Sequence, residues 1–189
     1  MNKFNMKTTK SFLAALIVIC AMTTTVFTAC GDDDDNINNS VDDNKPVAAV
    51  MVCELTVGDD MFNVLDLTVE YYDANGQVQS EQMTAKNWNK TVLAKLPATL
   101  GARLKIQVKN GIDPASLDVF TEDVKYAYSV NPVNASGKEQ SGGQAYISHP
   151  TLDMPGDKVA DWVAKHSNGL VKFLYTVNGN GQVTESTWQ

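Results

Sequence analysis

The sequence predicts an all-β domain with one short helix, built from antiparallel strands. Three features predict it. Apolar and polar residues alternate with a period of two over several stretches after residue 46, as in half-buried strands. Asn-Gly pairs, which accept the positive φ of tight hairpin turns, separate some of these stretches. Together they give about nine short strands at regular spacing, which indicates a sandwich or a barrel.

The predicted strands each place apolar side chains on one face and polar side chains on the other. The stretch 100–108 shows this most cleanly, with Arg103 and Lys105 opposite a row of aliphatic residues. Pro97, just before it, indicates a strand boundary because proline cannot donate to a central ladder. The sequence Asn131 to Gln144 is predicted to be a loop. The predicted strands cover 47–57, 65–72, 77–83, 100–108, 120–130, 145–148 and a final hairpin around 178–181.

One segment, between Pro155 and Gly169, has helical periodicity. We expect Asp157 to cap its N-terminus and Asn168-Gly169 to end it. The apolar stripe predicts that the tryptophan within it packs into the core. The stripe consists of Val159, Trp162, Val163 and His166.

The choice between sandwich and barrel rests on one stretch. From Trp88 to Val108, a tryptophan is followed by Leu-Pro-Ala and then by an alternating strand, which resembles many small envelope sandwich modules. This favours an antiparallel immunoglobulin-like β-sandwich. The alternative is a lipocalin-like β-barrel, because a late helix is followed by a strand. The sequence indicates no internal repeat.

The N-terminus predicts export. Three lysines precede an apolar run at 11–22, which has the length of a signal-peptide core and is shorter than the roughly 20 residues of a spanning helix. Phe27-Thr28-Ala29-Cys30 then resembles the lipobox of bacterial lipoproteins. The resemblance implies that residues 1–29 are a lipoprotein signal peptide and that Cys30 carries the lipid. Several acyl chains hold a protein stably on a membrane, whereas one gives only reversible binding.

An acidic run follows this cysteine directly, formed by Gly31, Asp32, Asp33, Asp34 and Asp35. It resembles the surface-export signal of Bacteroidetes lipoproteins. The resemblance implies a lipid anchor in the outer membrane and display on the cell surface; the alternative is a periplasm-facing anchor with a solvated spacer. Residues 30–46 are thus predicted to be a lipidated, disordered tether, because they contain almost no aliphatic residue.

Charge and cysteine content restrict the partners and the fold of the remaining domain, 47–189. Three of the 15 basic residues and none of the 22 acidic residues lie in the predicted signal peptide, residues 1–29. Removal of this peptide changes the net charge of the chain from −7 to −10. This acidity argues against nucleic acid as a partner. Cys53 would remain as the one cysteine besides Cys30, so no internal disulfide forms and we expect Cys53 to be a small buried residue.

The sequence carries no recognised catalytic or metal-binding motif, and His149 and His166 are its only imidazoles. We therefore expect no enzyme activity, no cofactor and no metal site. The candidate ligand-binding residues are Tyr72, Trp88 and Trp188, because sugar rings stack on exposed aromatic faces.

The expected function is a non-catalytic binding or accessory module of the cell envelope, with a glycan or an envelope protein as partner. The alternative is a structural or assembly lipoprotein that contacts an envelope protein without a small ligand.

Overall fold

The computed structural model describes residues 44–148 and 150–188. The described strands are β1 (Pro46–Val57), β2 (Leu65–Tyr72), β3 (Val78–Gln82), β4 (Asn87–Lys95), β5 (Ala98–Val108), β6 (Phe120–Glu122), β7 (Val124–Asn134), β8 (Gly143–Ser148), β9 (Leu152–Met154), β10 (Lys172–Val177) and β11 (Val183–Glu185). The helices are α1 (Asp59–Val64) and α2 (Val159–Lys165), with 3₁₀ turns η2 (Pro114–Ser116) and η3 (Gly156–Lys158).

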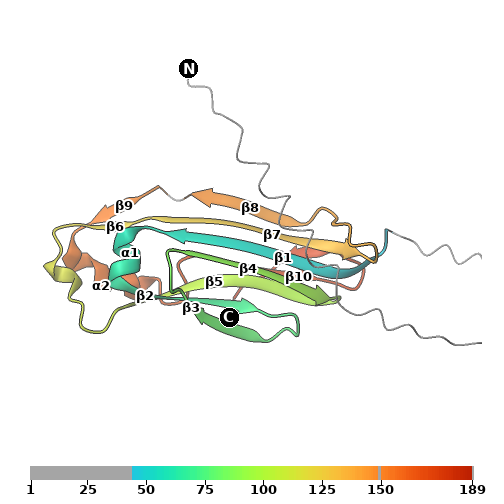
Figure 1. Cartoon of the computed structure of the whole chain (residues 1–189), viewed down its shortest axis with the longest axis horizontal. Coiled ribbons are helices and arrows are strands. Elements are labelled where there is room, and N and C mark those ends of the chain that lie inside the picture. Colours follow the sequence, from blue (N-terminus) through green and yellow to red (C-terminus); the bar gives the residue numbers. More distant parts are fainter. Residues whose placement is uncertain (1–43, 149, 189) are drawn as a thin grey trace, which may run out of the picture. The chain divides into compact units, whose positions relative to one another are not determined.

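Two antiparallel sheets make up most of this domain (Figure 1). One has the strand order β4-β1-β7-β8 and the other β11-β10-β5-β2-β3, and β6 and β9 form a small third sheet. Both large sheets end in unpaired edge strands and do not close, so the barrel alternative is wrong and the prediction of a sandwich-like, mostly β domain is confirmed.

The core lies between the two large sheets, where the alternating faces of the strands meet. On β2, Leu65, Leu67 and Val69 are buried, and the residues between them are half-buried on the outward face. The central strand β1 contributes Met51 and Leu55 from the opposite sheet. Period-two alternation therefore predicts the buried face of β1 and β2 correctly.

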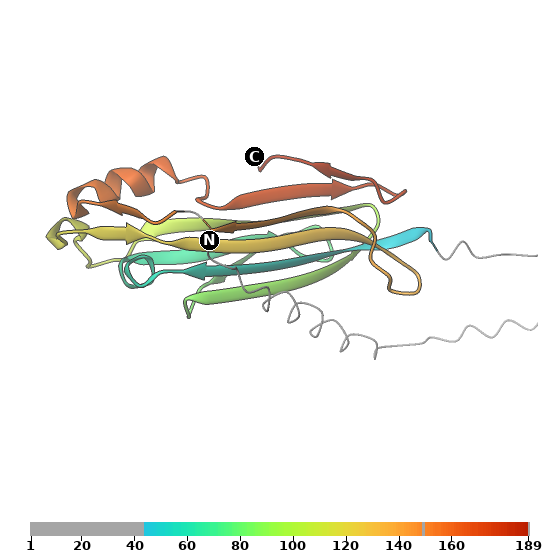
Figure 2. The same cartoon turned by 90° about the horizontal axis from the view of Figure 1, so that it is seen from above.

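The two ends of the sandwich differ. The helices α1 and α2 and the small β6–β9 sheet lie at one end (Figure 1). The start of β1 and the β10–β11 hairpin lie at the other end, as the view from above also shows (Figure 2). The β10–β11 turn packs directly against the start of β1, because a Cβ on Gly181 would lie 2.3 Å from Cγ of Pro46.

The predicted single strand 120–130 is wrong, because the chain breaks at Asp123 into β6 and β7. The carbonyl of Asp123 accepts a hydrogen bond from the backbone N–H of Gly58 at 2.8 Å. The backbone N–H of Thr121 donates to the carboxylate of Asp60 at 2.8 Å. The helix α1, for which the sequence gives no helical pattern, thus draws 120–122 away from the main sheet to pair with β9.

Two other predicted boundaries also need correction. The predicted loop 131–144 is shorter, because β7 continues its pairing with β1 to Asn134 and β8 begins at Gly143. The predicted helix is present as α2, but Asp157 makes no capping hydrogen bond, because it lies inside the 3₁₀ turn η3 that precedes the helix. Gly169 has a φ of 107°, as expected for the residue that stops the chain from continuing as a helix.

The predicted leader, Cys30, the acidic run 31–35 and His149 lie outside the described residues. Among the helices of the described residues, none combines the length and the apolar character that crossing a bilayer requires.

Candidate functional site

Of the three predicted ligand-binding residues, Trp88 is the one in the core. Only 9% of its surface is exposed, and its indole N–H donates to the carboxylate of Glu81 at 3.0 Å. Its ring packs against Tyr71, whose centroid lies 5.9 Å away. Neither face of the indole is therefore available as a stacking surface, and the candidate site rests on the other two residues.

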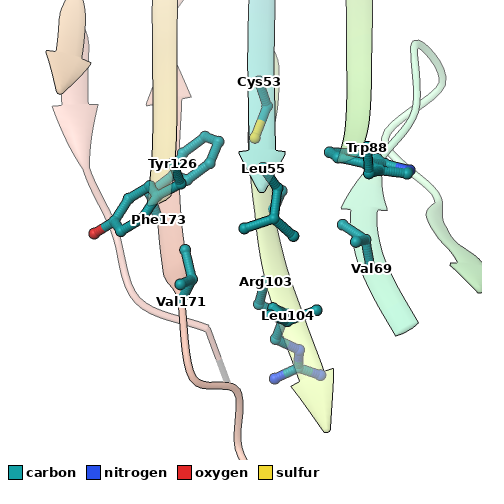
Figure 3. Close-up of a pocket in the computed structure, with 10 residues that line it drawn as sticks. Cys53, Leu55, Val69, Trp88, Arg103, Leu104, Tyr126, Val171 and Phe173 are labelled. Carbon is teal, nitrogen blue, oxygen red and sulfur yellow. The ribbon is translucent and has the colours of Figure 1, made fainter. Parts of the chain in front are cut away.

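A small cavity lies beside Trp88, between the sheets (Figure 3). Its volume is about 10 Å³, comparable with the space that one water molecule needs. Leu55 and Val69 line it from opposite sheets, and Phe173 and Val171 line it from the chain around the start of β10. A space this small and this apolar belongs to the packing of the core and offers no room for a ligand.

Tyr72 and Trp188 come together on the outward face of the five-stranded sheet. Their ring centroids are 5.0 Å apart, and both side chains are partly exposed. Tyr72 follows buried Tyr71 and so points away from the core. The indole N–H of Trp188 donates to the carbonyl of Phe173 on β10 at 2.9 Å. The C-terminal segment therefore holds an aromatic pair across β10, β5 and β2.

An ion pair supports this aromatic pair from one side. The guanidinium carbon of Arg103 lies 4.5 Å from the ring centroid of Trp188. The same side chain donates to Glu70 at 2.6 Å and to the side-chain oxygen of Asn168 at 2.9 Å. Because Arg103 is held from three sides, it fixes the position of the indole.

A groove of about 480 Å³ opens on the same sheet, in the size range of small-ligand sites. One wall is the β2–β3 turn and the other is the β10–β11 turn. Its polar side chains are all neutral hydroxyls and amides, from Asn75, Thr99, Thr176, Asn178, Gln182 and Thr184.

The two turns that form the walls have the same geometry. In the first, Oδ1 of Asp73 accepts from the backbone N–H groups of Asn75 and Gln77, both at 2.9 Å. In the second, Oδ1 of Asn178 accepts from those of Asn180 and Gln182, at 2.9 and 3.0 Å. These bonds make each turn rigid before any ligand arrives. The other carboxylate oxygen of Asp73 accepts from the side-chain amide of Gln79 at 2.8 Å, so this carboxylate serves to form the turn.

The sequence contains one signal for this groove. The tetrapeptide Asn-Gly-Gln-Val occurs at 75–78 and again at 180–183, each time two residues after an Asp or Asn. The glycines of both copies, Gly76 and Gly181, have φ values of 74° and 80°, which glycine adopts without strain. The same turn sequence therefore marks the two walls.

The side chains of Cys53 and His166 are both packed within the fold. Cys53 is buried, as predicted, and burial raises the pKa of its thiol to about 12, with a further contribution from Glu54. The imidazole Nδ1 of His166 lies 2.8 Å from the carbonyl of Trp162, and its ring packs on the buried indole of that residue. Over residues 44–148 and 150–188, no three His, Cys, Asp or Glu side chains are grouped as metal ligands would be.

Compared with known proteins, the chain matches no protein-family model and no curated protein sequence.

Proposed function

We propose that the chain is a lipid-anchored lipoprotein of the outer membrane, displayed on the cell surface, which acts as a non-catalytic binding module. The junction from Phe27 to Asp35 carries this proposal, because it combines a lipobox-like tetrapeptide with an acidic run directly after the cysteine. A lipid at Cys30 and a polar tether to Pro46 then hold the domain at the membrane while leaving it free to reorient.

The outward aromatic pair supports the binding role. Tyr72 and Trp188 present two adjacent rings on one sheet face, beside a groove with turn walls. Partly exposed aromatic rings with polar tips are the side chains that recur at ligand and protein interfaces. We propose a glycan or an envelope protein as the partner of this face, and no role for a cofactor.

The anchor is tested by replacing Cys30 with Ala in cells fed an alkyne-labelled fatty acid. We expect the wild-type protein to carry the label and to fractionate with the outer membrane. The C30A protein should carry no label and should leave the membrane fraction. C53A is the matched control and should remain labelled, because Cys53 lies within the folded domain. A labelled C30A protein would contradict the proposal.

A second candidate function, assembly with an envelope protein, is favoured by Leu93 on the edge strand β4. Its side chain is 50% exposed on the outward face of the other sheet, where it pairs with buried Val50 of β1. An exposed apolar side chain on an edge strand suits a protein contact. Crosslinking on intact cells that is lost in L93K and kept in Y72A would favour this function over glycan binding.

We also propose that the sandwich is immunoglobulin-like in its central strands. In that fold the second and fifth strands, B and E, pair in one sheet, and C and F pair in the other. Here β1 pairs with β4 and β2 with β5, while β3 lies beside β2 and β10 beside β5, as C′ and G would. There are two departures among the described residues: β7 occupies the position of strand A but comes later in the chain, and no strand takes the place of D beside β4. An experimental structure in which β1 does not pair with β4 would contradict this assignment.

A further inference from the structure

The groove between the β2–β3 turn and the β10–β11 turn suits one class of ligand. Sites that bind phosphates, metals or acidic polymers present charged side chains or metal-binding clusters. The polar side chains of this groove are all neutral hydroxyls and amides, set beside apolar Pro97, Ala98 and Val177, although 20% of the chain is charged. Hydroxyl and amide groups both donate and accept hydrogen bonds, as do the hydroxyl groups of sugars.

Several of these polar groups have hydrogen-bonding capacity to spare. Within the described residues, the hydroxyls of Thr99 and Thr184 make no hydrogen bond to another protein group. The side-chain amide of Asn75 is likewise exposed at the tip of its turn, whose backbone is held by Asp73. The amide N–H groups of Gln182 are also unused, because its oxygen is the atom that accepts from Asn178. These groups can therefore exchange water for a ligand without breaking internal bonds.

The aromatic pair lies at the next step along the same sheet face. On β5 and β10, Thr99 pairs with Thr176, and two residues away Gly101 pairs with Leu174. Trp188 is anchored at this second position, through its bond to the neighbouring carbonyl of Phe173. Two residues along a strand span about 7 Å, so a single extended ligand reaches both the groove and the rings.

We infer that this surface, formed by the groove and the Tyr72–Trp188 pair, binds a neutral glycan, with one sugar ring on the aromatic pair and the next in the groove. The inference rests on the proposed binding function and adds the ligand class and the place where the ligand sits. The apolar face of a sugar ring covers the aromatic surface, and its equatorial hydroxyls meet the threonine and amide groups.

The groove also lies at the tethered end of the domain. The turn that carries Gln182 packs on Pro46, where the tether enters. A tether of about 16 residues has a root-mean-square span of roughly 20 Å. A glycan reached at this distance has two sources with the same chemistry, namely a polysaccharide of the cell's own surface and a free oligosaccharide from outside.

The test is isothermal titration of the full mature protein, held in micelles of a polyoxyethylene detergent that contains no sugar. The probes are maltohexaose, xylohexaose and mannohexaose, with hexagalacturonic acid as the anionic probe of equal length. We expect at least one neutral hexasaccharide to bind with a Kd of about 1 mM or tighter, and the anionic probe to bind at least about tenfold more weakly. Neutral polysaccharide extracted from the producing cells is titrated in parallel, and its affinity relative to the hexasaccharides distinguishes the two sources.

Variants place the site. The double variant T99V/T184V keeps side-chain volume and removes two hydroxyls, and we expect about tenfold weaker binding with an unchanged Tm. Y72A should weaken binding by at least as much. T91V, an exposed threonine on β4 of the other sheet, is the matched control and should bind as the wild type does.

Absence of binding to every neutral probe, or binding that both the double variant and Y72A leave unchanged, would overturn the inference. Preference for hexagalacturonic acid would overturn it as well. If the protein is lipidated and displayed but binds no neutral glycan, the ligand class fails while the proposed anchoring and display stand.

Discussion

Glu81 is the group whose removal tests the packing of the sandwich most sharply. It lies on the edge strand β3, and its carboxylate accepts from the Tyr71 hydroxyl at 2.7 Å and from the Trp88 indole at 3.0 Å. It also pairs with the ammonium of Lys90 on β4. Because β3 and β4 are edge strands of different sheets, this one carboxylate joins the two sheets along their shared side.

The expected effect follows from what E81A leaves behind. Tyr71 and Trp88 are only 8% and 9% exposed, so both lose their acceptor in a nearly dry environment. Each orphaned donor costs about 1 kcal/mol or more, at the low end of the range because water can enter at the edge. The ion pair adds about 0–1 kcal/mol, since Lys90 and Glu81 side chains are 27% and 38% exposed. The total is about 2–3 kcal/mol.

Chemical denaturation followed by tryptophan fluorescence measures this loss. For a domain of about 150 residues, it corresponds to a fall in Tm of about 6–9 °C. E54A is the matched control, because Glu54 is exposed on β1 and makes no ion pair among the described residues; it should change stability by about 0.5 kcal/mol or less. An E81A protein no less stable than E54A would refute the role assigned to this carboxylate.

Three further predictions follow from groups that the fold buries or crowds. Burial alone would raise the pKa of Glu81, but hydrogen bonds from its three partners outweigh burial and lower it. The carboxylate therefore stabilises the fold above the unfolded pKa of about 4.3, and this stabilisation is lost as the pH falls through the folded pKa. The free energy of unfolding, measured from about pH 7 to about pH 2, should therefore fall less in E81Q than in the wild-type protein. Burial raises the pKa of Cys53 to about 12, so iodoacetamide at pH 8 should alkylate it only as fast as the domain unfolds, and rapid labelling of native protein would contradict its placement. A Cβ on Gly143 would lie 2.6 Å from the ring of Tyr175, so G143A should lose about 1–3 kcal/mol in urea unfolding, whereas G179A, with nothing within 4 Å, should be neutral.

Local patterns in the sequence predict the parts of this fold that depend on local physics. The buried face of β2 and the hairpin at Asn75-Gly76 follow from alternation and from positive φ, which are properties of a few adjacent residues. The helix α2 follows from a single apolar stripe, and Trp162 is buried as that stripe predicts.

The placement of Trp88 and Trp188 could not be predicted in the same way. The inward face of β4 carries Lys90 beside Trp88, and this charge is tolerated only because Glu81 reaches it from another sheet. Trp188 lies in a short polar tail without periodicity, and its place is set by contacts with Tyr72 and Arg103, far away in the chain. Sequence spacing carries no information on such pairings.

The candidate groove also depends on contacts between residues that are far apart in the sequence. Its walls are two hairpins that lie about a hundred residues apart, and its floor is set by the pairing of β5 with β10. Each turn was predictable by itself. The repeated Asn-Gly-Gln-Val was the one sequence signal that linked them.

The most direct test of the central claim, display of this domain on the cell surface, is protease shaving of intact cells. The comparison is between the wild-type protein and a variant in which Asp32 to Asp35 are changed to Ala. We predict that protease digests the wild-type protein, whereas the lipidated alanine variant is protected behind the outer membrane. Protection of both proteins would contradict surface display and would make the acidic run a solvated spacer.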